Sequence, residues 1–148
     1  MNKIDFVPAA YPRLQVELVY YVRELAAVWL PGERLADVFW RFYHCQGPGA
    51  EVLADGAWVP LVPDSVYLIP PYADLPVRCA PGDVGHLYVH FTVFGLVPAA
   101  RPSIHRLPLD DSGREQLAEL KRALAAGERA RVGLLAAGLC GRYLGTLP

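Results

Sequence analysis

The sequence predicts a mainly β fold, an antiparallel sandwich or barrel, followed by two C-terminal α-helices. The first observation is a series of short apolar or alternating segments over residues 55–91, separated by turn signals at Asp55-Gly56, Pro63-Asp64 and Pro81-Gly82-Asp83. Strands of this length and spacing build a sandwich or barrel rather than a sheet of βαβ units. The second observation is a change after about Pro108, where leucines recur every three or four residues, as in an amphipathic helix.

The expected strands follow from alternation and from β-branched and aromatic content. Residues 14–30 alternate between apolar and polar side chains, which favours a strand, although Leu25-Ala26-Ala27 also suits a helix. Residues 38–45, with the sequence VFWRFYHC, are dense in aromatic side chains, as is typical of a strand. The remaining strands are expected at 51–54, 57–61, 65–69, 75–79 and 86–94.

Two helices are expected at the C-terminal end. Asp110, Asp111 and Ser112 can each cap the first helix, because their side-chain oxygens accept hydrogen bonds from free amides of the first turn. Gly127 ends this helix, and a second is expected from residue 128 towards 143. The second helix contains three glycines, each costing about 1 kcal/mol relative to alanine. This pattern indicates either close packing against another helix or subunit, or a frayed end.

Composition limits the class of protein. The chain has 148 residues, 53% of them hydrophobic and 20% charged, which is typical of one globular domain. Its net charge of -1 lacks the basic excess of a DNA-binding domain. No apolar stretch has transmembrane length and the first residues lack a signal peptide's apolar core, so we expect a cytoplasmic protein without membrane contact. The three cysteines, without a CxxC motif, are expected to be reduced thiols.

The residues give no motif for catalysis or for a metal site. The four histidines include no HxH pair, and His86 and His90 lie about 13 Å apart along one strand, too far to bind one ion directly. Neither a GxSxG motif nor a glycine-rich phosphate loop is present. The sequence therefore predicts no catalytic residue, no metal and no cofactor, and a protein that is not an enzyme.

Three segments, in this order, resemble the N-terminal effector-binding domain of AraC-type transcriptional regulators, a cupin-like barrel. They are FYHCQGPG followed by a hairpin, PDSVYLIPP, and LYVHF. The resemblance implies an N-terminal arm over 1–13, a cupin-like effector-binding barrel over 14–107 and a helical dimerisation segment over 108–148. Family members continue into two helix-turn-helix units, so we expect contact with DNA only through a C-terminal domain that is missing from this chain.

In the resembled family, the strand expected over 86–94 faces the effector. Its alternate residues His86, Tyr88 and His90 combine rings with polar atoms, as a small-molecule pocket requires. The alternative is that this face is exposed to solvent. The opposite face of the same strand is purely apolar and is expected to pack against the second sheet or the helices.

The resemblance also guides the choice of face for residues 38–45. We expect Trp40, Phe42 and His44 to line the pocket. Arg41, on the other face, is the alternative anchor, because its planar guanidinium suits an anionic or hydroxylated effector. Tyr11 in the arm is expected either to close over the effector or to lie in a disordered terminus.

Together these features predict an effector-sensing and dimerisation domain that forms a homodimer and binds a small molecule, with sugars and aromatic compounds both fitting its rings. The subunit contact is expected through apolar helix positions, some of which must instead pack on the barrel: Leu120, Leu124, Val132, Leu135 and Leu139. Two alternatives remain open. One is a metal-dependent cupin enzyme, an isomerase or dioxygenase, and the other is a stand-alone carbohydrate-binding or scaffolding barrel.

Overall fold

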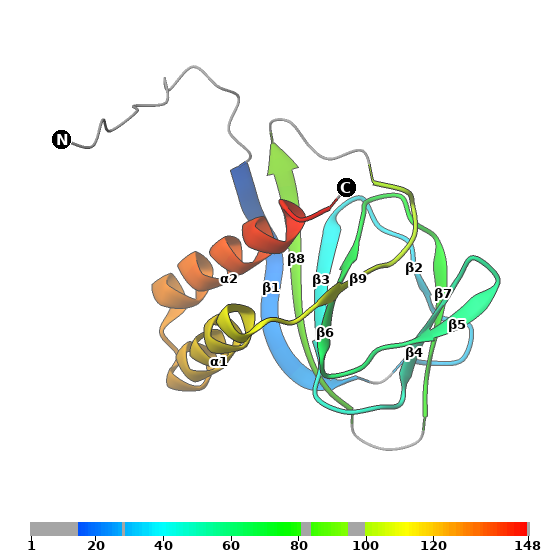
Figure 1. Ribbon diagram of the computed structural model, residues 1–148, viewed down its shortest axis with the longest axis horizontal. Helices are drawn as coiled ribbons and strands as arrows, with labels where there is room; N and C mark the ends of the chain where they lie inside the picture. Colours follow the sequence, from blue (N-terminus) through cyan, green and yellow to red (C-terminus); the bar gives the residue numbers. More distant parts are fainter. Residues whose placement is uncertain (1–14, 28, 81–83, 95–99, 148) are drawn as a thin grey trace.

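The chain folds into three layers, with two antiparallel β-sheets face to face and two helices against the outer face of the larger sheet (Figure 1). The computed structural model describes residues 15–27, 29–80, 84–94 and 100–147, and for residues 18–27 it describes the backbone only. This arrangement confirms the predicted fold class.

The larger sheet has the strand order β1-β8-β3-β6-β9, and the smaller sheet has the order β2-β7-β4-β5. The strands are β1 (Gln15–Ala27), β2 (Arg34–Leu35), β3 (Trp40–Cys45), β4 (Ala50–Ala54), β5 (Ala57–Pro60), β6 (Ser65–Ile69), β7 (Leu75–Cys79), β8 (Val84–Phe94) and β9 (His105–Pro108). The strand alternative for β1 is therefore confirmed over the helical one. β2 and β9 were not expected from the sequence, because two and four residues are too few to show a period.

The hairpin between β4 and β5 forms at the expected Asp55-Gly56 turn. Both residues have positive φ, 51° and 78°, and Ala54 pairs with Ala57 across the turn. A two-residue loop of this kind matches the right-handed twist of the two strands that it joins.

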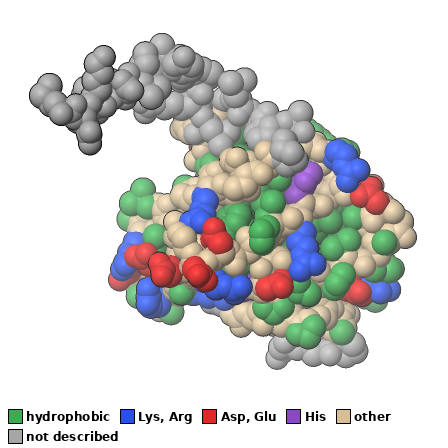
Figure 2. Space-filling model, viewed as in Figure 1, with side chains coloured by type: hydrophobic (Ala, Val, Ile, Leu, Met, Phe, Trp, Pro, Cys, Tyr) green, Lys and Arg blue, Asp and Glu red, His purple; other side chains and the backbone are tan. Residues whose placement is uncertain are grey.

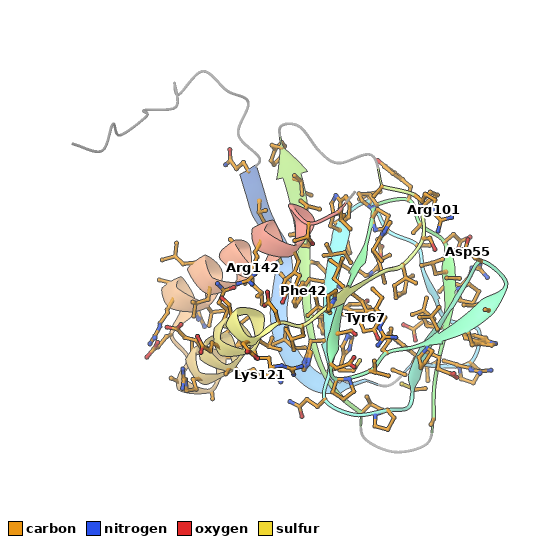
Figure 3. All side chains as sticks on the ribbon, in the orientation of Figure 1. Phe42, Asp55, Tyr67, Arg101, Lys121 and Arg142 are labelled. Atoms are coloured by element: carbon orange, nitrogen blue, oxygen red, sulfur yellow. The ribbon has the colours of Figure 1, made fainter. Side chains whose placement is uncertain are left out.

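The central strands β3 and β6 of the larger sheet are buried on both faces, and the described residues form one apolar core on each side of them. One lies between this sheet and the helices and includes Phe42, Val89 and Leu120. The other lies between the two sheets and includes Tyr43 and Tyr67. Figure 3 shows Phe42 on the helix side of the sheet and Tyr67 on the side of the smaller sheet. Successive residues of β3 therefore enter different cores, because side chains alternate along a strand.

The helices are α1 (Asp111–Ala126) and α2 (Arg129–Leu144). Of the three candidate caps, Asp110 is the one used, since its Oδ1 accepts a hydrogen bond from the Gly113 amide at 2.7 Å. Gly127 ends α1 with φ of 70°, a left-handed conformation that glycine adopts without steric cost. On the face drawn in Figure 2, acidic and basic side chains lie close together over the helix pair, and Arg131 bridges to both Glu119 and Glu128.

The helix positions expected at a subunit contact pack mainly inside the chain. Leu120 and Leu139 are 0% and 1% exposed in the core below the helices, so their expected place at a subunit contact is corrected. Leu124, Val132 and Leu135 are partly buried against the same core. The helical period identifies an apolar face, but it does not distinguish burial against the chain's own sheet from burial against a second subunit.

Candidate functional site

A row of rings and one guanidinium lies between the two sheets, on the inner face of β3 and β8. These strands are neighbours, and their register pairs Arg41 with His90 and Tyr43 with Tyr88. We call this set the interior ladder. It consists of Trp29, Phe39, Arg41, Tyr43, His86, Tyr88 and His90.

The rings of the interior ladder form one continuous chain of contacts. The centroids of Tyr43 and His86 lie 4.5 Å apart, and Tyr88 follows at 5.5 Å from His86. Tyr88 is 4.9 Å from His90, which stacks on Phe39 at 4.5 Å with 27° between the ring planes. The ladder therefore combines stacked and edge-on ring contacts along one face of the larger sheet.

Arg41 supplies the positive charge of the ladder. The residue is only 5% exposed, donates a hydrogen bond to the carboxylate of Asp37 and lies over the Phe39 ring, with 5.0 Å between its guanidinium carbon and the ring centroid. Burial lowers its pKa, while the Tyr43 hydroxyl beside it acts in the opposite direction. Among the described residues, its Nε has no hydrogen-bond partner.

The two histidines of the ladder are neutral at pH 7. Burial, followed by the neighbouring His90 and His44, lowers the pKa of His86 to about 4. Burial and the Arg41 charge lower the pKa of His90 to about 4. A neutral imidazole offers one donor and one acceptor nitrogen. His86 is 5% exposed, and its Nε2 lacks a hydrogen-bond partner within the described part of the chain.

The predicted site residues divide between the two faces of the larger sheet. Arg41, His86, Tyr88 and His90 come together in the interior ladder. Trp40 and Phe42 instead lie in the core below the helices, and His44 belongs to the same face. The expectation that Trp40, Phe42 and His44 share a face with His86, Tyr88 and His90 was wrong. The alternative was correct, because Arg41 lies on the face of those β8 residues. Tyr11 lies outside the described residues.

Sequence reasoning missed three members of the ladder. Phe39, Arg41 and Tyr43 occupy every second position and so share one face of the strand. Choosing that face of 38–45 would have found Phe39 and Tyr43. Trp29 follows the end of β1, and its ring reaches His86 with 5.9 Å between the centroids. No local pattern in the sequence indicates that approach.

A cleft of about 370 Å³ lies at the other face of the same sheet. It is bounded by α1, by the residues that follow β3 and by the residues that precede β6. Its lining residues are His44, Gln46, Pro63, Leu109, Arg114, Leu117, Ala118 and Lys121. His44 is thus brought to this cleft, where its Nε2 lies 3.1 Å from the carbonyl oxygen of Pro63. Figure 3 shows Lys121 on the side of α1 that faces the lower end of the larger sheet.

Within the described ranges, no group of three or more His, Cys, Asp and Glu side chains is placed to hold a metal ion. The absence of a metal, of a cofactor and of catalysis stays a prediction.

In the part of the chain that the structure describes, neither helix is long and apolar enough to cross a membrane.

No protein-family model and no curated protein sequence matches this chain. A crystal structure of an apo variant of ToxT from Vibrio cholerae is similar, with 6% identity and a TM-score of 0.50, over 88% of this chain and 54% of that one. A crystal structure of unsaturated fatty acid bound wild-type ToxT from Vibrio cholerae matches with 7% identity and a TM-score of 0.46, over 91% and 54%. The chain thus spans about half the length of these ToxT chains. At 6% identity the first similarity is one of fold, and it agrees with a β-barrel-like domain followed by two helices.

Proposed function

We propose that this chain is the effector-sensing region of an AraC-type transcriptional regulator, and that the effector binds between the sheets against the interior ladder. The observation that carries the proposal is the pair of buried nitrogens, Arg41 Nε and His86 Nε2, without hydrogen-bond partners among the described residues. Leaving a buried polar group unpaired costs about 1–3 kcal/mol. A ligand with an acceptor for Arg41 Nε, and with an acceptor or a donor for His86 Nε2 according to the tautomer of that imidazole, offsets that cost.

The fold supports the class of protein. ToxT, whose structure is similar, is an AraC-family regulator. A shared fold is an analogy and does not by itself assign a function, so the residues of the ladder carry the proposal. The proposed protein is not an enzyme, acts in the cytoplasm and contacts DNA through a domain outside the given sequence.

The same two strands connect the proposed site to the helices. β3 and β8 carry the ladder on one face and Phe42 and Val89, which pack below the helices, on the other. An effector that binds more tightly to one arrangement of these strands therefore also favours one arrangement of the helix pair. Its effect is to change the populations of conformations that already exist without it. We propose that the helix pair forms a homodimer through the outer side of α2, where Leu134 is 78% exposed.

The proposal is tested by measuring thermal unfolding with a panel of monosaccharides and aromatic carboxylates. A ligand that binds the folded state raises the Tm. Tyr88→Ala is expected to abolish the shift, because Tyr88 lies between both histidines of the ladder. Tyr72→Ala is the matched control, since Tyr72 is 78% exposed. An unchanged shift in Tyr88→Ala would exclude the ladder as the effector site.

A further inference from the structure

We propose that the cleft between α1 and the larger sheet is a second binding site, which takes a small amphiphilic carboxylate. The cleft is separate from the interior ladder. His44 lines the cleft from β3, while Arg41 and Tyr43 of the same strand point between the sheets, and the larger sheet lies between the two sites. The inference does not depend on the effector that the ladder binds.

The charge of the cleft favours an anion. Arg114 and Lys121 line it from α1, seven residues or about 10 Å apart along the helix axis, and both side chains are long enough to reach a group between them. None of the eight lining residues is acidic. Hydrogen bonds from Ser65 at 2.7 Å and from Arg106 at 3.2 Å, followed by the charges of Arg106 and Arg114, lower the pKa of the nearby Asp64 carboxyl, so two guanidiniums share this one carboxylate.

The floor of the cleft is apolar. Leu109 and Leu117, which are 6% and 4% exposed, line the cleft together with Arg114 and Lys121. Pro63 and Ala118 add further apolar lining. A fully hydrated anion gains nothing from such a surface, whereas an apolar body removes it from water at about 25 cal/mol per Å². The lining therefore favours a carboxylate on an apolar body over a sugar or inorganic phosphate.

The size of the cleft limits the ligand. At about 370 Å³ it lies at the lower end of the range of small-molecule sites. A single aromatic ring with a short carboxylate arm is the size of compound that it suits. Such a ligand contacts α1 through Leu117 and Lys121 and the end of β3 through His44, so its binding fastens the helix to the sheet.

The test adds phenylacetate, its neutral analogue phenylacetamide or inorganic phosphate to the intact chain. Binding of each probe is measured from the NMR chemical shifts of the backbone amides. Phenylacetate is expected to shift the amide signals of residues 44–46 and 114–121. Its affinity should be at least about tenfold higher than that of either other probe, because it alone combines a negative charge with an apolar ring. Raising the salt concentration should weaken its binding.

Two double variants decide whether the cations of the cleft are responsible. Arg114→Ala with Lys121→Ala is expected to weaken phenylacetate binding at least about tenfold, the loss of roughly one charge-assisted hydrogen bond. Arg122→Ala with Arg129→Ala removes the same net charge from exposed helix positions outside the lining and should leave the affinity within about twofold. Equal affinity in both variants would overturn the proposal. So would the absence of binding, phosphate binding as tightly as phenylacetate, or shifts confined to β8 residues of the ladder.

Discussion

The His86 ring packs edge-on against the Tyr43 ring, with centroids 4.5 Å apart and 83° between their planes. Both residues are at most 5% exposed, at 5% and 3%, and they come from neighbouring strands of the larger sheet. The contact places a titratable ring where its charged form is poorly solvated. The same contact belongs to the interior ladder, where His86 also meets the rings of Trp29 and Tyr88.

We expect the stability of the fold to fall on acidification. His86 and His90 have a pKa of about 4 in the folded state, below the ordinary value of 6.5. The unfolded chain therefore binds more protons between these values. The stabilising effect is complete above about pH 6.5 and is lost as the pH falls towards 4, by at most about 1.4 kcal/mol per pH unit for each histidine. The contribution of His90 to this loss of stability is smaller than that of His86, because His90 is partly exposed and solvent screens its charge.

Urea unfolding at several pH values checks this expectation. His86→Phe keeps a ring against Tyr43 but removes the titrating group, so its stability should depend less on pH between about 6.5 and 4. His105→Phe, on the edge strand β9, is the control and should retain the wild-type slope. If His86→Phe has the wild-type slope as well, His86 is not a buried neutral imidazole.

A second prediction concerns the contact between Gly113 and Tyr143, where the first turn of α1 meets α2. A Cβ at position 113 would overlap the Tyr143 hydroxyl, so Gly113→Ala should destabilise the fold by about 1–3 kcal/mol. Tyr143→Phe removes that hydroxyl and should recover part of the loss in the double variant. At Gly138 an added Cβ would meet no atom of the described residues within 4 Å outside its own stretch of helix, and Gly138→Ala should stabilise α2 by about 0.5–1 kcal/mol. Urea unfolding measures all three, and a neutral Gly113→Ala would contradict the packing described.

A third prediction concerns the end of α2, where Arg142 bridges to the start of α1. Its guanidinium donates to the Asp110 carboxylate and to the Ser112 hydroxyl, each at 2.6 Å. Asp110→Asn keeps an acceptor for the Gly113 amide but loses the charge, whereas Asp110→Ala loses both. The Tm should therefore fall in the order wild type, Asp110→Asn, Asp110→Ala. Equal values for the two variants would mean that capping contributes nothing measurable.

The sequence was sufficient for most strands because proline and glycine mark their ends. Ser65–Ile69 and Leu75–Cys79 have the predicted bounds, and the first lies between Pro63-Asp64 and Pro70-Pro71. The orientation of β3 was not predictable from its own residues. All six are buried, because helices cover one face and the smaller sheet covers the other, so alternation gives no apolar and polar side to choose between.

The candidate sites depend even more on tertiary structure. The β8 residues of the ladder were predicted because their face alternates with the purely apolar Leu87, Val89 and Phe91. Arg114 and Lys121 are seven residues apart, or about two helical turns, and charged residues at this spacing are common on helix faces that are exposed to solvent. Their spacing alone therefore does not indicate a binding site. Only the packing of α1 beside His44 and Pro63 turns that face into the wall of a cleft.

Arg41 allows a direct test of how the ladder recognises its ligand. Its planar guanidinium makes bidentate hydrogen bonds that the lysine ammonium cannot reproduce. For a ligand found by thermal unfolding, Arg41→Lys should weaken binding by about 1–3 kcal/mol in calorimetry. Arg78→Lys, on the smaller sheet, is the control, because Arg78 is exposed and pairs with Glu51. Equal affinity of wild type and Arg41→Lys would remove Arg41 from the site.

The most direct test of the central claim is a crystal structure of the protein with a ligand that raises its Tm. The account predicts density between the two sheets, with ligand atoms within hydrogen-bond distance of Arg41 Nε and His86 Nε2 and a ligand face against Tyr88. Density only outside this space, with both nitrogens bonded to protein atoms, would contradict the assignment of the interior ladder as the effector site.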